Sequence, residues 1–191
     1  MAPAGLDIGG ISAEETLLKS RRAIFVLSVT ARSDFVREDM TMDMNGSETI
    51  NAPIDAVWRG LNDPDILRQC IPGCEALDKS SDTEMTATVV LKVGPVKARF
   101  EGAVQLSNLN PPHSYTISGE GKGGMVGFAK GGADVSLAEQ ADGTTVLTYT
   151  VKADVGGKIA QLGARLIDST AKKLAEQFFS NFGKTVTEGA A

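Results

Sequence analysis

Apolar and polar residues alternate along much of the chain between residues 75 and 155, which is typical of strands that bury one face. Short turn motifs, Gly94-Pro95 and Asp142-Gly143 among them, separate the alternating segments at hairpin length. The pattern therefore predicts about six antiparallel strands in one sheet. The alternating segments are EALDKS, TEMTATVVLKV, VKARFEGAVQLSNL, SYTISGEGK, ADVSLAEQ and TTVLTYTVKADV.

Helical spacing replaces this alternation at two places. After a first strand in NGSETINAP, the apolar residues of IDAVWRGLND recur at helical spacing behind Pro53, and Asp63 caps a second short helix in DPDILRQC. From Gly156-Gly157 to about Thr185, one apolar stripe indicates a long helix. The stripe consists of Ile159, Leu162, Leu166, Thr170, Leu174, Phe178 and Phe182.

A sheet with one apolar face must bury that face, and the terminal helix is the one predicted element long enough to cover it. We therefore predict an α+β fold in which a curved antiparallel sheet wraps around a long C-terminal helix. Two short helices follow the first strand. The domain is expected to span residues 44–187, with a short tail over residues 188–191.

Residues 1–43 show no sustained period and are expected to be a disordered extension. Within them, Ala23–Val29 follows KSRR and precedes Thr30-Ala31, which resembles the end of a short secretory signal. That interpretation stays open beside the preferred one, an unstructured extension from an upstream start. No stretch approaches the roughly 20 apolar residues that a membrane-spanning helix needs.

Composition narrows the classes of function. The chain has 191 residues, 42% of them apolar, and a net charge of −5, which suits one domain with a core and disfavours a nucleic-acid partner. Cys70, Cys74 and the single histidine, His113, are too few and too scattered for a typical zinc site. Two reduced, partly buried thiols are the preferred interpretation, and they fit a cytoplasmic setting.

The stretch GEGKGGMVGFAKGGADVSL begins with a match to G-x-G-x-x-G, a pattern of dinucleotide-binding turns. That motif needs a helix after the glycines, and here strand alternation returns, so nucleotide binding is disfavoured. Glycines within strands mark bends or room for a ligand. We expect them to let two paired strands curl and to leave space beneath the terminal helix, with a cavity rim formed by Met125, Val126 and Phe128.

A set of segments, taken in order over residues 44–186, carries a family resemblance. The most specific is Cys70-Ile71-Pro72-Gly73-Cys74-Glu75; the others are INAPIDAVWRGLNDPD, KVGPVKARFEGAV, the glycine-rich stretch and GGKIAQLGARLIDSTAKKLAEQFFSNF. Together they resemble the CoxG family, the G-type subunits of carbon monoxide dehydrogenase, within the START-like (SRPBCC), helix-grip superfamily. The resemblance implies a helix-grip fold and a small cavity protein without chemistry of its own.

The resemblance also implies partners. Proteins of this family are encoded beside molybdenum-containing hydroxylases such as CO dehydrogenase, and the resemblance implies that they bind an isoprenoid quinone or a lipid and link the enzyme to the membrane. Longer members carry a C-terminal membrane-binding segment that does not follow GKTVTEGAA here, so a peripheral contact with the inner membrane is the form we expect. No covalently bound cofactor is expected.

The expected function is non-catalytic binding of a hydrophobic ligand between sheet and helix, with plain core packing as the alternative role of each wall residue. An enzyme on the same fold, such as a cyclase or hydrolase, is a second hypothesis, and an assembly or adaptor factor for a molybdenum hydroxylase is a third. Glu101 and Asp134 are expected to point outward, and His113 lies at a turn, so no acid–base pair is evident. The expected wall residues are Trp58, Val89, Leu91, Phe100, Tyr149, Leu162, Leu166 and Phe178.

Overall fold

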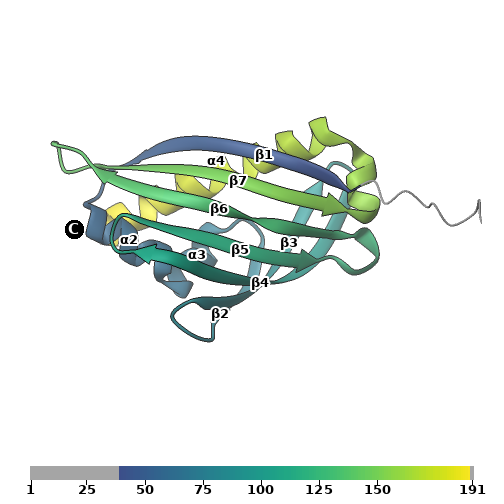
Figure 1. Ribbon diagram of the computed structural model, residues 1–191, viewed down its shortest axis with the longest axis horizontal. Coiled ribbons are helices and arrows are strands. Elements are labelled where there is room, and N and C mark those ends of the chain that lie inside the picture. Colours follow the sequence, from purple (N-terminus) through teal and green to yellow (C-terminus); the bar gives the residue numbers. More distant parts are fainter. Residues whose placement is uncertain (1–38, 190–191) are drawn as a thin grey trace, which may run out of the picture. The chain divides into compact units, whose positions relative to one another are not determined.

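A computed structural model of the protein describes residues 39–189. Within that range, seven strands form one antiparallel sheet in the order β1-β7-β6-β5-β4-β3-β2 (Figure 1). The signal-like segment Ala23–Val29 lies outside the described residues. The strands are β1 (Met40–Ile50), β2 (Cys74–Lys79), β3 (Glu84–Val93), β4 (Val96–Asn110), β5 (Ser114–Lys122), β6 (Phe128–Glu139) and β7 (Thr145–Gly156).

The strands bury the face that the alternation predicted. On β6, Val135 and Leu137 are buried, whereas the alternating residues Asp134 and Ser136 are exposed. Hairpin pairing aligns neighbouring strands, so that Val135 lies opposite Tyr115 of β5 on one side and opposite Tyr149 of β7 on the other. One face of the sheet is therefore apolar from edge to edge.

Two short helices, α2 (Ile54–Asn62) and α3 (Pro64–Cys70), follow β1 as predicted. α2 starts directly after Pro53, whose ring restricts φ to a value compatible with a helix start. The Asp63 carboxylate accepts two hydrogen bonds from the first N–H groups of α3, at 2.9 and 3.2 Å. This is the N-cap that the sequence indicated, and it sets the bend between the helices.

The long helix α4 (Ala164–Gly189) lies along the apolar face of the sheet (Figure 1), which confirms the predicted helix-grip arrangement. Its C-terminal part packs beside α2. Gly60 allows this close approach, because a Cβ at that position would lie only 2.9 Å from Cγ2 of Val186.

The helix predicted from Gly156-Gly157 onward is interrupted. The segment η2 (Gly157–Leu162) is a 3₁₀ helix, and Gly163 then takes a φ of 87° before α4 begins. A positive φ breaks a right-handed helix and suits glycine, which has no Cβ. Leu162 consequently lies outside α4, although it continues the apolar stripe in the sequence.

β1 begins at Met40, before the domain start expected at residue 44. Met40 lies opposite Val155 of β7, and both Met40 and Met42 pack against buried residues at that end of the sheet. The ordered domain therefore includes residues that the sequence pattern alone placed in the extension.

The buried apolar side chains form two groups, one at each end of α4. The first cluster surrounds α2 and the C-terminal part of α4, and the second surrounds η2 and the N-terminal part of α4. The first cluster contains Ile50, Ala52, Ile54, Val57, Leu61, Cys70, Met85, Leu106, Tyr115, Val135, Leu137, Leu147, Phe182 and Val186. The second contains Val93, Val155, Ile159, Ala160 and Ile167.

The glycine-rich stretch spans the hairpin between β5 and β6. A single 3₁₀ turn, η1 (Gly124–Val126), joins the two strands, so the helix that a dinucleotide-binding turn requires does not follow the glycines. Gly119 and Gly131 lie opposite each other in the pairing, as do Ser118 and Gly132. The glycines thus belong to two paired strands, as the sequence indicated.

Candidate functional site

The middle of α4 packs only partly against the sheet. The buried residues of α4 are Ile167, Phe182 and Val186, and none lies between Ile167 and Phe182. Leu174 and Phe178 face the sheet in this interval but are only half-buried. A large apolar side chain that faces a sheet without being buried borders empty space.

That space is a cavity of about 510 Å³ between the sheet and α4. All seven strands contribute to its wall, together with α2, α3 and α4. Its lining residues are apolar except for Tyr115 and Tyr149, which each add one hydroxyl. Small-molecule sites typically have roughly 300–1,000 Å³ and a largely apolar wall, so this cavity has the size and the lining of such a site.

Alanines keep the cavity open. Ala87 on β3 and Ala133 on β6 face it from the sheet, and Ala171 and Ala175 face it from α4. Larger residues at these inward positions would fill the space between the two layers, as they do in an ordinary core. The void therefore follows from particular small residues and not from loose packing in general.

A second hollow of about 370 Å³ adjoins the cavity. Val89, Leu91 and Phe100, three of the predicted wall residues, line it. So do Gly102, Gly119 and Gly121; a Cβ placed on Gly121 meets no atom within 4 Å. The two hollows share Ile71, Pro72, Ala87, Val104 and Leu174.

Tyr149 lies at the β1 side of the cavity. Its ring stacks on Phe179 of α4, with centroids 5.2 Å apart and an interplanar angle of 23°. Partial burial raises the pKa of the Tyr149 phenol, and the carboxylates of Glu48 and Glu176 raise it further. The half-exposed hydroxyl therefore stays protonated at neutral pH and serves as a hydrogen-bond donor.

Tyr115 lies deeper in the wall and is only 5% exposed. The Trp58 ring meets it edge to face, with centroids 5.5 Å apart and an interplanar angle of 82°, which fixes the orientation of the phenol. Burial strongly raises the pKa of Tyr115, so this hydroxyl too is a donor and carries no charge.

The predicted wall residues do not all line the cavity in the structure. Tyr149 and Phe178 line the cavity, and Trp58 packs behind Tyr115 in the first cluster. Leu162 and Leu166 pack against the second cluster instead. Three further wall residues line the adjoining hollow, as described above.

The three residues expected at the rim lie outside both hollows. Met125 is 84% exposed in the η1 turn, and Val126 packs against the second cluster. Phe128 lies opposite Gly156 in the pairing of β6 with β7. None of the three lines the cavity or the adjoining hollow.

Sequence reasoning missed the wall residues between α3 and β2 and most of those on α4. Ile71 and Pro72 were interpreted only as part of a turn and a family motif, yet both line the two hollows. Ala171, Ala175 and Phe179 flank the stripe at helical spacing, and that spacing is the signal that could have found them.

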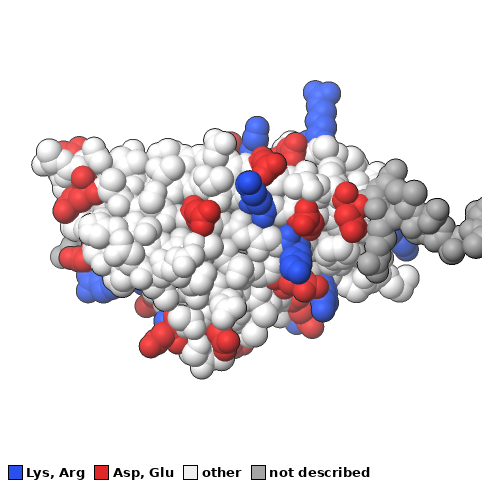
Figure 2. Space-filling view, viewed as in Figure 1, with Lys and Arg blue, Asp and Glu red and all other residues white. Residues whose placement is uncertain are grey.

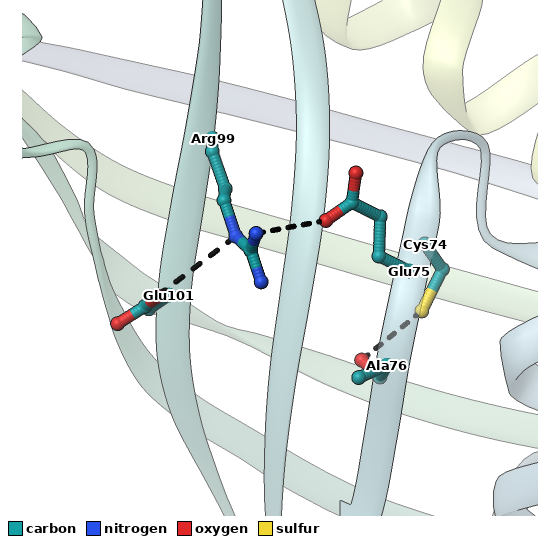
Figure 3. A network of polar contacts seen from close by, with 5 residues as sticks. All are labelled: Cys74, Glu75, Ala76, Arg99 and Glu101. Atoms are coloured by element: carbon teal, nitrogen blue, oxygen red, sulfur yellow. Dashed lines mark hydrogen bonds and ion pairs between the residues drawn. The ribbon is translucent and has the colours of Figure 1, made fainter.

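The polar groups considered for catalysis lie away from the cavity. His113 is exposed at a turn, and Asp134 is exposed on the outer face of the sheet. Glu101 lies 3.9 Å from the Arg99 guanidinium, which also lies 3.4 Å from Glu75 (Figure 3). These exposed ion pairs tie β2 to β4 across the outer surface and contribute little to stability.

Cys70 and Cys74 are free cysteines, and both thiols are protonated at neutral pH. Burial raises the pKa of the Cys70 and Cys74 thiols. The Cys74 thiol lies 3.4 Å from the Ala76 carbonyl oxygen (Figure 3), and the Cys70 thiol lies 3.8 Å from the Thr185 hydroxyl. A thiol with a raised pKa is a poor nucleophile and a poor metal ligand at neutral pH.

The described surface carries charges of both signs. On the face of the sheet in Figure 2, basic and acidic side chains are interspersed. Over residues 39–189, no group of three or more His, Cys, Asp or Glu side chains is placed to hold a metal ion. No helix of that same range is both long and apolar enough to cross a membrane.

Solved structures share this fold. A conserved protein from Geobacillus kaustophilus is similar at 31% identity over 78% of this chain and 98% of its own, with a TM-score of 0.73. The Zhui aromatase/cyclase from Streptomyces sp. R1128 is 10% identical over 78% of this chain and 94% of its own, with a TM-score of 0.58. A norcoclaurine synthase from Thalictrum flavum is 15% identical over 81% and 99%, with a TM-score of 0.52.

No curated protein sequence matches the chain. The sequence profile of one family does match it, over residues 46–187, from within β1 to near the end of α4. The protein belongs to the CoxG family, the G-type subunits of carbon monoxide dehydrogenase.

Proposed function

We propose that the protein binds an apolar ligand, an isoprenoid quinone or another lipid, in the cavity between the sheet and α4, and that it does not transform this ligand. The partly packed middle of α4, which lies over an apolar cavity of about 510 Å³, carries the proposal. Membership of the CoxG family and the shared fold of the solved structures support a role in binding hydrophobic ligands.

We further propose that it serves a molybdenum-containing hydroxylase of the CO dehydrogenase type and links that enzyme to the membrane quinone pool. The family description supports an association with carbon monoxide dehydrogenase. A quinone with an isoprenoid tail leaves a bilayer only at a large hydrophobic cost. A cavity that shields the molecule offsets that cost, so a carrier could present it to an enzyme away from the lipid.

An enzyme is the second candidate, because an aromatase/cyclase and a norcoclaurine synthase share the fold. The cavity wall disfavours it: Tyr115 and Tyr149 are its only titratable residues, and it holds no histidine, lysine or carboxylate among the described residues. Phenols with raised pKa values are poorly matched to proton transfer at neutral pH. The wall suits binding better than turnover.

Saturable ligand binding tests the proposal directly. Trp58, the single tryptophan, packs beside Tyr115, so its fluorescence reports quinone binding. We expect a short-chain menaquinone to quench it saturably in the wild type and about tenfold more weakly in Ala133→Leu, which fills the cavity. Ala138→Leu, exposed on the same strand, is the matched control and should bind as the wild type does.

Three outcomes separate the candidates. An absence of saturable quenching, or equal affinity in Ala133→Leu and wild type, would contradict the carrier proposal. Recovery of a chemically altered ligand after incubation would favour an enzyme. If Ala133→Leu binds no quinone but still restores electron delivery from the hydroxylase to quinone, the protein acts as an adaptor and not as a carrier.

A further inference from the structure

The hydroxyl of Tyr115 has no hydrogen-bond partner among the described residues. The residue is 5% exposed, and no described residue forms a hydrogen bond with its hydroxyl; burial is the sole influence on its pKa. Buried hydroxyls are normally paired, because an unpaired one has lost its bonds to water. An unpaired, buried donor in the wall of a binding cavity therefore calls for an external partner.

The hydroxyl is not sealed among apolar atoms. No fully enclosed polar side-chain atom in residues 39–189 lacks a partner, so a hydroxyl without one must reach free space. The side chain of Tyr115 lies on the buried face of β5, and the free space that this face borders is the cavity. Trp58 holds the ring edge to face and so fixes where the hydroxyl points.

Tyr149 provides an internal comparison. Both tyrosines lie in one row across the sheet, with Val135 of β6 between them, so their main chains are about 10 Å apart at the usual strand spacing. Tyr149 is half-exposed beside Glu48 and Glu176, and water can satisfy its hydroxyl. Water can reach the Tyr115 hydroxyl only inside an apolar cavity, where a water molecule finds few other hydrogen-bond partners, so a ligand gains more from pairing with Tyr115.

The chemistry of the wall restricts that ligand. A neutral phenol donates to an oxygen acceptor, and a hydrocarbon offers none. A carboxylate would also accept, but the wall contains no Lys or Arg to compensate a buried charge. The acceptor that fits is a neutral carbonyl oxygen on an apolar body, which a quinone head group provides.

We propose that the Tyr115 hydroxyl binds a neutral carbonyl oxygen of the ligand, so that a quinone enters head group first and its tail runs toward the adjoining hollow. Gly121 of that hollow lies six residues along β5 from Tyr115, about 20 Å at the rise of a strand. The two hollows share wall residues, so the tail would pass directly from one to the other. This inference rests on the proposed quinone-binding function and adds its polar anchor and its orientation.

Tyr115→Phe tests the anchor, with Tyr149→Phe as the matched control. Phe keeps the ring against Trp58 and removes only the hydroxyl. For a short-chain menaquinone, we expect Tyr115→Phe to weaken binding about tenfold and Tyr149→Phe to weaken it less than about threefold. For a naphthalene hydrocarbon with the same tail and no oxygen, neither variant should weaken binding.

Two further measurements exclude a merely structural effect. The infrared carbonyl stretch of the bound quinone should move to higher frequency in Tyr115→Phe, because one carbonyl loses its hydrogen bond. The ligand-free variant should melt at the same temperature as the wild type or above it, because an unpaired buried hydroxyl has been removed. A lower melting temperature without ligand would show that the hydroxyl has a partner within the protein, and this would overturn the inference.

The outcomes distinguish this inference from the function on which it rests. If the wild type binds menaquinone saturably and Tyr115→Phe binds it equally well with an unchanged carbonyl stretch, the anchor is wrong and the carrier proposal stands. If the wild type does not bind menaquinone, the proposed quinone-binding function fails and takes the anchor with it.

Discussion

Phe182 and Leu174 lie on the same face of α4, about two turns apart, yet Phe182 is fully buried and Leu174 is half-exposed. The first belongs to the cluster that joins the end of α4 to α2 and the sheet, and the second borders the cavity. Both are large apolar side chains that face the same sheet. The difference lies in what faces them: bulky residues at the end of the helix, and alanines such as Ala87 and Ala133 at its middle.

The ends of α4 and its middle therefore have different roles at the interface between the helix and the sheet. The two clusters at the ends of α4 hold the helix on the sheet, and the interval between them borders the cavity. An empty cavity lacks the dispersion contacts and the burial that filling it would provide. The packing at the two ends of α4 must therefore compensate for the contacts that are missing at its middle.

The largest expected effect separates Phe182 from Leu174. Phe182→Ala should lower the free energy of unfolding by about 3–5 kcal/mol, because it leaves a cavity in a sealed cluster. Leu174→Ala should cost about 1 kcal/mol, because its side chain is only partly buried and already borders the cavity. Urea unfolding of the ligand-free proteins measures both, and equal losses would mean that the middle of α4 is packed like its end.

A second comparison uses alkaline pH to distinguish the buried Tyr115 from the half-exposed Tyr149. Burial holds the pKa of Tyr115 above its unfolded value near 10, so below pH 10 both states keep the proton and stability is unaffected. Above pH 10 the unfolded chain releases the proton first. Stability then falls by about 1.4 kcal/mol per pH unit until the folded pKa is reached.

Tyr115→Phe should remove this loss of stability. Tyr149 should contribute a smaller loss of its own, because its phenol is less buried, and Tyr149→Phe should remove only that smaller loss. The measurement is the urea midpoint of wild type and both variants between pH 9 and pH 11. Parallel curves for wild type and Tyr115→Phe would show that the hydroxyl is in contact with water.

The smallest expected effect on stability concerns the adjoining hollow. Gly121→Val should change the free energy of unfolding by no more than about 0.5 kcal/mol, because no atom lies within 4 Å of the added Cβ. The new side chain enters the hollow, so it should weaken a long-tailed quinone more than a short-tailed one. Titration of Trp58 fluorescence with both quinones checks this, and equal weakening would place the tail elsewhere.

The faces of the strands could be predicted from the sequence because the period of side chains along a strand is two. Leu147 and Tyr149 point inward for that reason, and the turn motifs between strands are short enough to require hairpins. The same alternation extends back to Met40 and Met42, where so short a pattern could not be distinguished from the aperiodic segment before it.

The cavity could not be predicted in the same way, because periodicity tells which residues face inward and not whether the space between them is filled. Leu166 and Phe178 belong to one stripe, yet Leu166 packs against the second cluster and Phe178 lines the cavity. The volume depends on small residues such as Ala133 and Ala175, which line the cavity from two layers that are distant in the sequence. The break at Gly163 shifts the stripe further, since a positive φ cannot be read from spacing.

The pairing of β1 with β7 also has a consequence for folding. Met40 lies opposite Val155, so the sheet joins positions that lie more than 100 residues apart in the sequence. Contacts of such long sequence separation are slow to form, because a long loop must close before any of them stabilises the chain. During synthesis, the inner face of β2 to β6 therefore stays without its covering helix until α4 has left the ribosome. The cavity can therefore form only after α4 has been synthesised, because α4 provides one of its walls.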